Sequence, residues 1–256
     1  MNYIFAAENH ISAITDGIYA DSHKHWMLQL FISAKGNLTI DVEGQQIACC
    51  CILVAADTIH SFSSENKLHF TMLVEQTSLL AKQLTEKYLS KDRYYIIDNI
   101  TSEIIQRELT DIEQIILNNG YAYFLNKLLN VLGIDRTMHK KCDHRIVRIL
   151  ETFNKCDLSE HTLEQLASKV CLSKSRMSHL FKKETGIPLN SYMVLHKLQK
   201  AYLYLFENGN ITAAAMRAGF DSPSHFAYTS KVMTGMSAKS INKDSVFLKV
   251  SEFDMF

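Results

Sequence analysis

Between about residues 25 and 75, apolar and polar residues alternate, and many of the apolar ones are β-branched or aromatic. Turn sequences interrupt the pattern at 34–37 and 43–45. Such alternation is typical of strands with one buried face. The pattern is carried by four apolar segments, residues 28–32, 38–42, 52–54 and 68–74. Several short strands joined by tight turns predict a small β-sandwich or β-barrel in the N-terminal half.

After residue 100 the apolar residues recur at helical spacing, first over 104–116 and then over 121–132. Asn118-Asn119-Gly120 separates the two segments. This pattern predicts two helices after the β-domain, with most of their apolar residues in the core. The polar and basic residues at 133–141 predict a linker.

From Asp143 onward the pattern predicts helices only. Their ends carry local signals, such as a capping box that starts at Thr162 and a serine followed by proline at 222–223. Gly186, with Pro188 just beyond it, marks the end of a helix. The predicted helices lie near 143–154, from 162, over 173–186, 189–206 and 211–218, and from 222 to 235.

Composition narrows the class of protein. The 256 residues suffice for two domains, and 47% hydrophobic with 21% charged residues indicates a globular protein. The chain has no run of eighteen apolar residues and its first residues lack a secretion signal, so we expect neither secretion nor a membrane span. The six cysteines lack the paired spacing of zinc sites. We interpret them as reduced thiols, which predicts a cytoplasmic location.

The formal net charge of zero conceals a difference between the two halves. Residues 1–135 contain 9 Lys and Arg against 16 Asp and Glu, a net charge of −7. Residues 136–256 contain 18 against 11, a net charge of +7. A basic C-terminal half favours a polyanionic partner for that half, although a chance imbalance would give the same count.

Two stretches of the C-terminal half, 167–186 and 215–235, resemble each other. Each predicts a short helix, a tight turn with one buried apolar residue (Leu172 or Phe220) and a capped second helix. The second copy is one residue longer in the turn. A small alanine in the first helix of each copy allows the two helices to cross closely, so one polar face of the second helix stays free. That arrangement is a helix-turn-helix, in which the free face enters the major groove of DNA.

The free faces carry suitable side chains. In the first copy they are Lys174, Ser175, Arg176, Ser178, His179, Lys182 and Lys183. In the second copy they are Pro223, Ser224, His225, Ala227, Tyr228 and Lys231. Ser, His, Arg and Tyr can hydrogen-bond base edges, and lysines suit phosphates, as do Lys197 and Lys200 between the copies. Ordinary solvated faces are the alternative. Two copies joined by a helix of about one DNA repeat favour DNA binding.

Residues 143–243 resemble the AraC/XylS-type transcription regulator domain. The similar segments are LEQLA at 163–167, LSKS at 172–175, HLFKKETG at 179–186, LQKA at 198–201, AGFDS at 218–222 and GMS at 235–237. The resemblance implies that the base-facing residues are Ser175, Ser178, His179, Ser224, His225 and Tyr228. His179 and Tyr228 stand where family members often have Arg, and Ala238 replaces the usual proline after the Gly-x-Ser ending, so the second copy is expected to be less base-specific.

The resemblance implies a multidomain fold: an N-terminal cupin-like β-barrel or sandwich with two following helices, and a C-terminal all-α double helix-turn-helix domain. We assign residues 1–100 to a cupin-like sensor domain, 101–135 to a helical dimerisation and linker segment, and 143–243 to the DNA-binding domain. The implied function is a sequence-specific transcription regulator, not an enzyme. The expected partners are double-stranded promoter DNA, a second copy of the chain, a small-molecule effector and, as a further candidate, RNA polymerase.

The N-terminal half carries a weaker, cupin-like signal in His23-Lys24-His25, Gln29 and His60. We take these residues, with Trp26, as the candidate effector site: His23, His25, Trp26, Gln29 and His60. Trp26 is equally suited to the core. Enzymatic cupins hold a metal with His-x-His, a Glu and a distant His, but Gln29 occupies the Glu position. We therefore expect no metal and no other cofactor.

Alternatives stay open at this point. His23, His25 and His60 on a divalent ion would suit a cupin-type metalloenzyme with an attached DNA-binding domain. The basic half would also suit a protein that binds nucleic acid without sequence preference. Cys49 and Cys51 would lie on one face of a strand and Cys50 on the other, as buried small residues or as a sensor of thiophilic metals or oxidants.

Overall fold

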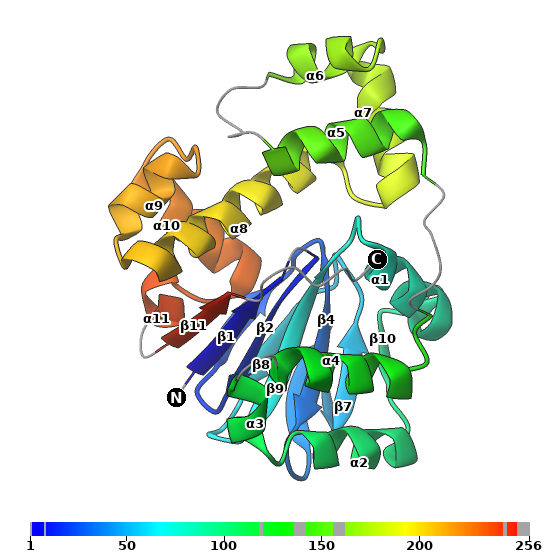
Figure 1. The fold of residues 1–256 in the computed structure, drawn as a ribbon, viewed down its shortest axis with the longest axis vertical. Helices are drawn as coiled ribbons and strands as arrows, with labels where there is room; N and C mark the ends of the chain where they lie inside the picture. The colour runs from blue at the N-terminus through cyan, green and yellow to red at the C-terminus, as the bar shows by residue number, and fades with distance from the viewer. Residues whose placement is uncertain are drawn as a thin grey trace. The chain divides into compact units, whose positions relative to one another are not determined.

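The computed structural model describes residues 2–7, 9–117, 120–135, 142–155, 162–242 and 245–249. It divides into two compact units (Figure 1). Unit 1 comprises Met1–His139, Val232–Met236 and Lys243–Phe256. Unit 2 comprises Lys140–Lys231 and Ser237–Asn242. Among the described residues, every strand belongs to unit 1, and the regular elements of unit 2 are helices.

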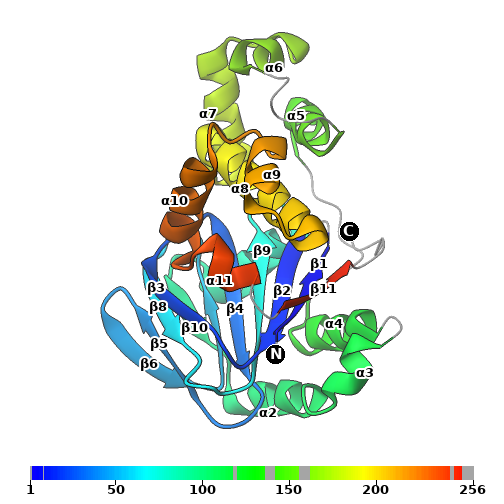
Figure 2. The same ribbon diagram turned by 90° about the vertical axis from the view of Figure 1, so that its left-hand side faces the viewer.

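Unit 1 contains two sheets, as the alternating pattern predicts. The larger has the strand order β10-β7-β4-β9-β2-β1-β11, and the smaller has the order β3-β8-β5-β6 (Figure 2). The strands are β1 (Asn2–Ala6), β2 (His10–Thr15), β3 (Tyr19–His23), β4 (Met27–Ser33), β5 (Leu38–Val42), β6 (Gln45–Cys49), β7 (Cys51–Val54), β8 (His60–Ser63), β9 (His69–Glu75), β10 (Tyr94–Ile96) and β11 (Ser245–Lys249).

The larger sheet is buried on both faces, because successive residues of its strands enter two different cores. Leu30 of β4 and Leu53 of β7 belong to the core that the sheet shares with the helices. Their neighbours Phe31 and Ile52 belong to the core between the two sheets. Side chains of a strand alternate between faces, so a strand with an apolar residue at nearly every position must be covered on both sides.

The cysteine triplet was expected to lie within one strand, and this prediction is wrong. Cys49 ends β6 in the smaller sheet, whereas Cys51 begins β7 in the larger one. Cys50 forms the corner between them, and its Sγ donates to Asn37 Oδ1 at 3.1 Å. Cys49 and Cys51 therefore enter different cores instead of sharing one face.

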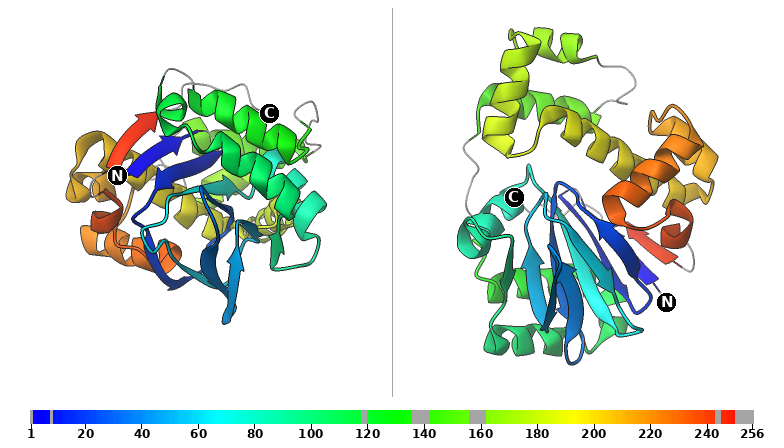
Figure 3. Two further views of the ribbon diagram at one scale, coloured as in Figure 1. Left: turned by 90° about the horizontal axis from the view of Figure 1, so that it is seen from below. Right: turned by 180° about the vertical axis from the view of Figure 1, so that it is seen from behind.

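Helices cover the face of the larger sheet that points away from the smaller sheet (Figures 2 and 3). In chain order, the helices of unit 1 are α1 (Leu79–Leu84), the π-helix η1 (Thr85–Leu89), α2 (Asn99–Glu108), α3 (Ile112–Ile116) and α4 (Gly120–Val131). The segment predicted as one helix over 104–116 is thus two helices. Asp111 caps the second of them, because its side chain accepts from Gln114 N at 3.2 Å.

The predicted linker begins later than expected. Gln83 Nε2 donates to Asp135 O at 2.6 Å, and Asp135 N donates to Gln83 Oε1 at 2.7 Å. Lys87 Nζ also donates to Leu132 O at 2.8 Å. These bonds fasten the chain to unit 1 as far as residue 135, and the remainder of the predicted linker, 136–141, lies outside the described residues.

Unit 2 follows the predicted helices closely. They are α5 (His144–Lys155), α6 (Leu163–Lys169), α7 (Lys174–Thr185), α8 (Leu189–Asn208), α9 (Ile211–Arg217) and α10 (Pro223–Thr234), whose last residues belong to unit 1. A further short helix, α11 (Ala238–Asn242), was not predicted. Thr162 and Gln165 form the predicted capping box. Gly186, with φ 80°, ends α7 in the left-handed conformation. In the described parts of the chain, no helix combines the length and the apolar character that crossing a bilayer requires.

The prediction of helices alone after Asp143 is wrong at the C-terminal end. Residues 245–249 form β11, which pairs in parallel with β1 from Asn2↔Ser245 to Ala6↔Lys249. This strand extends the larger sheet of unit 1, and its partner lies more than two hundred residues away in the chain, where a local pattern gives no signal. The predicted fold class is otherwise confirmed: a β-rich N-terminal part and a helical C-terminal part.

Candidate nucleic-acid interface and candidate effector site

The turn between α6 and α7 is closed by two backbone hydrogen bonds. Leu172 N donates to Ala167 O at 3.0 Å, and Cys171 N donates to Ser168 O at 3.1 Å. Cys171 has φ 53°, the left-handed conformation that this pair of bonds requires. The pattern is a Schellman motif. Leu172, the residue after the left-handed one, was predicted to be buried and is half-buried.

The turn between α9 and α10 repeats the same arrangement. Phe220 N donates to Ala215 O at 3.0 Å, and Gly219 N donates to Met216 O at 3.1 Å. Gly219 takes the left-handed position with φ 78°. The extra residue of the second copy follows Phe220, so it leaves the motif intact and only delays the start of α10.

The second helix of each copy begins at an equivalent serine. Ser173 Oγ accepts from Arg176 N at 3.3 Å. Ser222 Oγ accepts from His225 N at 3.1 Å. Each serine satisfies one backbone N–H that the first turn of a helix leaves without a partner, and so sets where α7 and α10 start.

Both second helices pack on α8 through a fully buried phenylalanine. The ring of Phe181 in α7 lies 5.2 Å from that of Tyr192, and the ring of Phe226 in α10 lies 5.7 Å from that of Tyr202. The Tyr202 hydroxyl also bonds Ser230 Oγ at 2.6 Å. Figure 1 shows α7 and α10 towards opposite ends of α8. Because α8 has 20 residues, it spans about 30 Å, close to the roughly 34 Å between neighbouring major-groove segments.

The predicted face of α7 is open to solvent. Of the seven predicted residues, Ser178 is half-buried. The other six are exposed: Lys174, Ser175, Arg176, His179, Lys182 and Lys183. Lys174 Nζ forms an ion pair with Glu164 of α6. Met177 and Phe181 of the same helix are buried in the core.

The predicted face of α10 is exposed as well but less basic. Ser224, His225 and Lys231 are exposed, and Tyr228 is 70% exposed. His225 Nδ1 lies 3.1 Å from Asp221 Oδ2. Asp221 is the extra residue of the second turn. Lys197 of α8 differs from the others, because it is half-buried and its Nζ donates to Gly219 O at 2.8 Å. This bond anchors the second turn to α8, and nothing in the sequence signals it.

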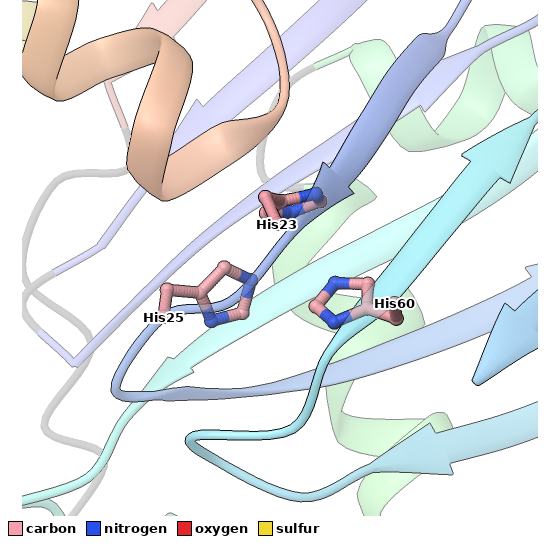
Figure 4. Close-up of side chains that lie close together, drawn as sticks. All are labelled: His23, His25 and His60. Atoms are coloured by element: carbon pink, nitrogen blue, oxygen red, sulfur yellow. The ribbon is translucent and has the colours of Figure 1, made fainter. Parts of the chain in front are cut away.

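The structure brings together four of the five candidate effector residues. His23 and His60 are cross-strand partners in the pair β3–β8, next to a bulge in β3. His25 follows in the bend before β4, and the rings of His23, His25 and His60 gather round one point (Figure 4). Ring centroids of His23 and His60 lie 4.3 Å apart, and those of His25 and His60 lie 5.1 Å apart. All three side chains are buried.

Backbone carbonyls orient the three rings in the same way. His23 Nδ1 donates to Asp21 O at 2.7 Å, and His60 Nδ1 donates to Thr58 O at 2.9 Å. His25 Nδ1 lies 3.1 Å from Met27 O, the nearer of the two backbone groups of Met27. A neutral imidazole that donates through Nδ1 has its lone pair on Nε2, so His23 and His60 present unprotonated Nε2 atoms. His25 Nδ1 also accepts from Met27 N at 3.3 Å.

Gln29 of β4 completes the cluster. Its Oε1 lies 3.1 Å from His25 Nε2 and 2.9 Å from His60 Nε2. Its Nε2 donates to Thr71 Oγ1 of β9 at 3.1 Å, which directs the amide oxygen towards the rings. Thr71 was not predicted, because no local pattern relates β4 to β9. Trp26 lies half-buried in the bend before β4.

Burial keeps the rings of His25 and His60 neutral. Burial, followed by the neighbouring His60 and His23, lowers the pKa of His25 to about 3. Burial also lowers the pKa of His60. At pH 7 these rings are uncharged acceptors, which suits them to bind a cation or a hydrogen-bond donor.

Cys49 and Cys51 provide no comparable reactive group. Burial, together with the neighbouring Cys50, raises the pKa of Cys49 to about 11. Burial likewise raises the pKa of Cys51 well above its usual value. Thiols react with metals and oxidants as thiolates, so these two are poor sensors and behave as buried small side chains.

The comparisons of sequence with known proteins concern the C-terminal half. A family model described as "Helix-turn-helix domain" matches residues 166–244. The arabinose operon regulatory protein of Escherichia coli (strain K12) is 30% identical over 108 residues, which cover 41% of this chain and 37% of the relative. Its counterpart from Salmonella typhimurium (strain LT2) is 29% identical over 106 residues. The chain thus matches less than two fifths of the length of these curated relatives.

Solved structures match almost the whole fold. The apo crystal structure of a ToxT variant from Vibrio cholerae has a TM-score of 0.56 at 11% identity, and covers 92% of this chain and 97% of that one. Wild-type ToxT with a bound unsaturated fatty acid has a TM-score of 0.51 at 10% identity, with 92% and 95% covered. At such identities the likeness shows the two-part architecture alone. The match to the family model and the repeated turns show that residues 166–244 form a helix-turn-helix domain.

Proposed function

We propose that this chain is a sequence-specific DNA-binding transcription regulator whose β-rich unit receives an effector. The observation that carries the proposal is the repeated element: two turns with the same pair of hydrogen bonds present two exposed polar helices towards opposite ends of one connecting helix. Two such helices spaced by about one DNA turn fit consecutive major-groove segments. The arabinose operon regulatory protein, with a related domain, supports the assignment to transcription.

We assign two kinds of contact to these faces. Phosphates are bound by the exposed cations, Lys174, Arg176, Lys182, Lys183 and Lys231, with Lys197 in a supporting position. Base edges are read by the polar side chains between them, Ser175, Ser178, His179, Ser224, His225 and Tyr228. Phosphate contacts govern affinity and its salt dependence, whereas base contacts govern discrimination between sequences.

The test separates these two roles. Duplexes selected from a random library by the full-length protein are bound to variants in a gel-shift series. Arg176→Ala with Lys182→Ala is expected to weaken binding to every sequence about tenfold or more and to reduce the salt slope by about two. His179→Ala is expected to relax discrimination at one base position.

A matched control removes the same amount of positive charge at positions outside the proposed faces. Lys35→Ala with Lys91→Ala removes two exposed cations from unit 1. This control should bind as the wild-type protein does. Equal effects of the two double variants, together with an inert His179→Ala, would contradict the assigned faces.

We further propose that the regulator acts as a cytoplasmic homodimer, with RNA polymerase as a candidate partner at the promoter. Apolar side chains on the helices of unit 1 support the dimer, because Ile100 of α2 is 76% exposed and Tyr123 of α4 is 63% exposed. Exposed apolar surface of this kind favours association. Light scattering should show two chains per particle, and Ile100→Asp should shift the mass towards one chain.

We place the effector at the cluster of His23, His25, Gln29 and His60, with Trp26 beside it. The ligand-bound ToxT structure, which holds an unsaturated fatty acid, supports effector binding in proteins of this architecture. The cluster here is polar and built from nitrogen and oxygen acceptors, so its occupant need not resemble that ligand.

A further inference from the structure

We propose that His23, His25 and His60 form a binding site for one divalent transition-metal ion, with Gln29 Oε1 as a fourth ligand. The inference rests on the proposed function, because the ion would be the effector of the regulator. It departs from the expectation of no metal, which was based on the absence of a glutamate ligand and not on where the rings lie.

The first argument is distance. One ring nitrogen from each histidine lies within 4.8 Å of the others. Two nitrogens bound to a tetrahedral zinc ion at 2.0–2.1 Å lie about 3.3 Å apart. The three rings therefore need only small side-chain rotations to reach a common ion, and Gln29 Oε1 already lies within 3.1 Å of two of them.

The second argument is how the ligands are held. The cross-strand pairing of His23 with His60 fixes two of the three backbone positions. The third is tied to the loop before β8, because Asp57 N donates to His25 O at 2.7 Å and Lys24 Nζ pairs with Asp57 Oδ1 at 2.8 Å. Each ring is further held through Nδ1 by a backbone carbonyl. Such outer contacts orient metal-binding histidines and fix their tautomer.

The third argument is an unfavourable contact that a cation removes. His60 donates through Nδ1, so its Nε2 is an acceptor, yet it faces Gln29 Oε1, a second acceptor, at 2.9 Å. A positive ion among the rings converts this repulsion into attraction. Imidazole ligands select zinc, copper, nickel or iron over calcium and magnesium, which prefer several oxygens.

Binding is tested on the full-length protein without DNA, by equilibrium dialysis against Zn²⁺ alone. The expected result is one ion per chain in the wild-type protein. The Zn²⁺ affinity should fall at least a hundredfold in His25→Gln and in His60→Gln. His144→Gln is the matched control, because its side chain is 90% exposed and lies in unit 2. Binding that is absent, or equal in His25→Gln and His144→Gln, overturns the proposal.

Gln29→Glu tests the site without removing a histidine. A carboxylate at this position adds a negative ligand, so Zn²⁺ affinity should rise at least tenfold while the folded structure is kept. Unchanged affinity overturns the role of Gln29. In Co²⁺-loaded protein, visible bands of a four-coordinate nitrogen and oxygen site are expected, and a thiolate band would assign the ion to cysteines instead.

DNA binding is measured separately, with and without Zn²⁺. A change in DNA affinity that Zn²⁺ produces in the wild-type protein but not in His25→Gln supports the ion as effector. Sequence-specific DNA binding by a protein that takes up no Zn²⁺ in dialysis overturns this inference and leaves the proposed function standing. Stoichiometric metal binding by a protein that does not bind DNA supports the metal site and contradicts the proposed function.

Discussion

The two helix-turn-helix copies share their backbone and differ in their surface. Both turns have the same pair of hydrogen bonds, both second helices begin at a serine, and both pack a buried phenylalanine on α8. The exposed face of α7 carries four cations, whereas Lys231 is the only Lys or Arg in α10. The geometry is set by backbone bonds and a few apolar side chains, so the exposed positions are free to differ in chemistry.

The largest expected effect concerns what the copies share. Phe181 and Phe226 are each 0% exposed, and truncating either to alanine should lower the free energy of unfolding by about 3–5 kcal/mol. Urea unfolding followed by circular dichroism measures both. Tyr228→Ala is the control, because this aromatic ring is exposed and its loss should change stability by less than about 0.5 kcal/mol. If one of the two truncations left stability unchanged, the phenylalanine of that copy would not be packed in the core as the other is.

Local sequence signals explain why the helical part was predicted well. Caps, glycine stops and helical spacing lie within a few residues of the boundaries they mark, as at Thr162, Ser173 and Gly186. The same signals missed β11, because its strand character depends on pairing with β1 at the other end of the chain. They also merged α2 with α3, since an aspartate cap inside an apolar repeat is easily overlooked.

The candidate sites show the same division. The exposed faces of α7 and α10 followed from helical spacing alone. The histidine cluster depends on the cross-strand register of His23 with His60 and on Gln29 reaching across from β4, which are non-local. Residue types suggested these positions, but neither the convergence of the rings nor the carbonyls that orient them can be read from the sequence.

Acid should sharpen the comparison by acting near the first copy. His196 of α8 donates from Nε2 to Phe153 O at 3.1 Å, and burial, followed by the charge of Lys200, lowers its pKa to about 4. The unfolded chain takes up this proton near pH 6.5, whereas the folded protein resists it until about pH 4. Stability is therefore complete above pH 6.5 and falls as the pH decreases towards 4.

Between pH 7.5 and 5 this residue should cost about 2 kcal/mol of stability. Urea unfolding at the two pH values measures the loss. In unit 1 burial also lowers the pKa of His10 to about 4, that of His25 to about 3, and those of His60 and His69, so the wild-type difference contains all of these groups. His196→Gln isolates the contribution of His196, because it should show a smaller pH dependence. An identical pH dependence in that variant would contradict the account.

The third effect concerns the difference between the exposed faces. Lys182→Ala with Lys183→Ala removes two cations from α7 and should weaken binding to selected DNA about tenfold or more. Lys231→Ala in α10 should weaken it less, and should lower the salt slope by about one instead of two. Gel shifts over a salt series measure both. Equal loss per copy would show that α10 contributes phosphate contacts beyond this lysine.

The smallest effect lies in the turns, where the copies differ by one residue type. Gly219 takes its left-handed φ of 78° without strain, whereas Cys171 takes a φ of 53° with a β-carbon present. Gly219→Ala should therefore lower the free energy of unfolding by about 1 kcal/mol, and Cys171→Gly should raise it by up to about 0.5 kcal/mol. Cys171→Ala keeps the strain and removes only an exposed thiol, so it should change little. Urea unfolding of the three variants decides whether the first turn bears the strain that the glycine of the second avoids, and a destabilised Cys171→Gly would show that the thiol side chain supports the turn.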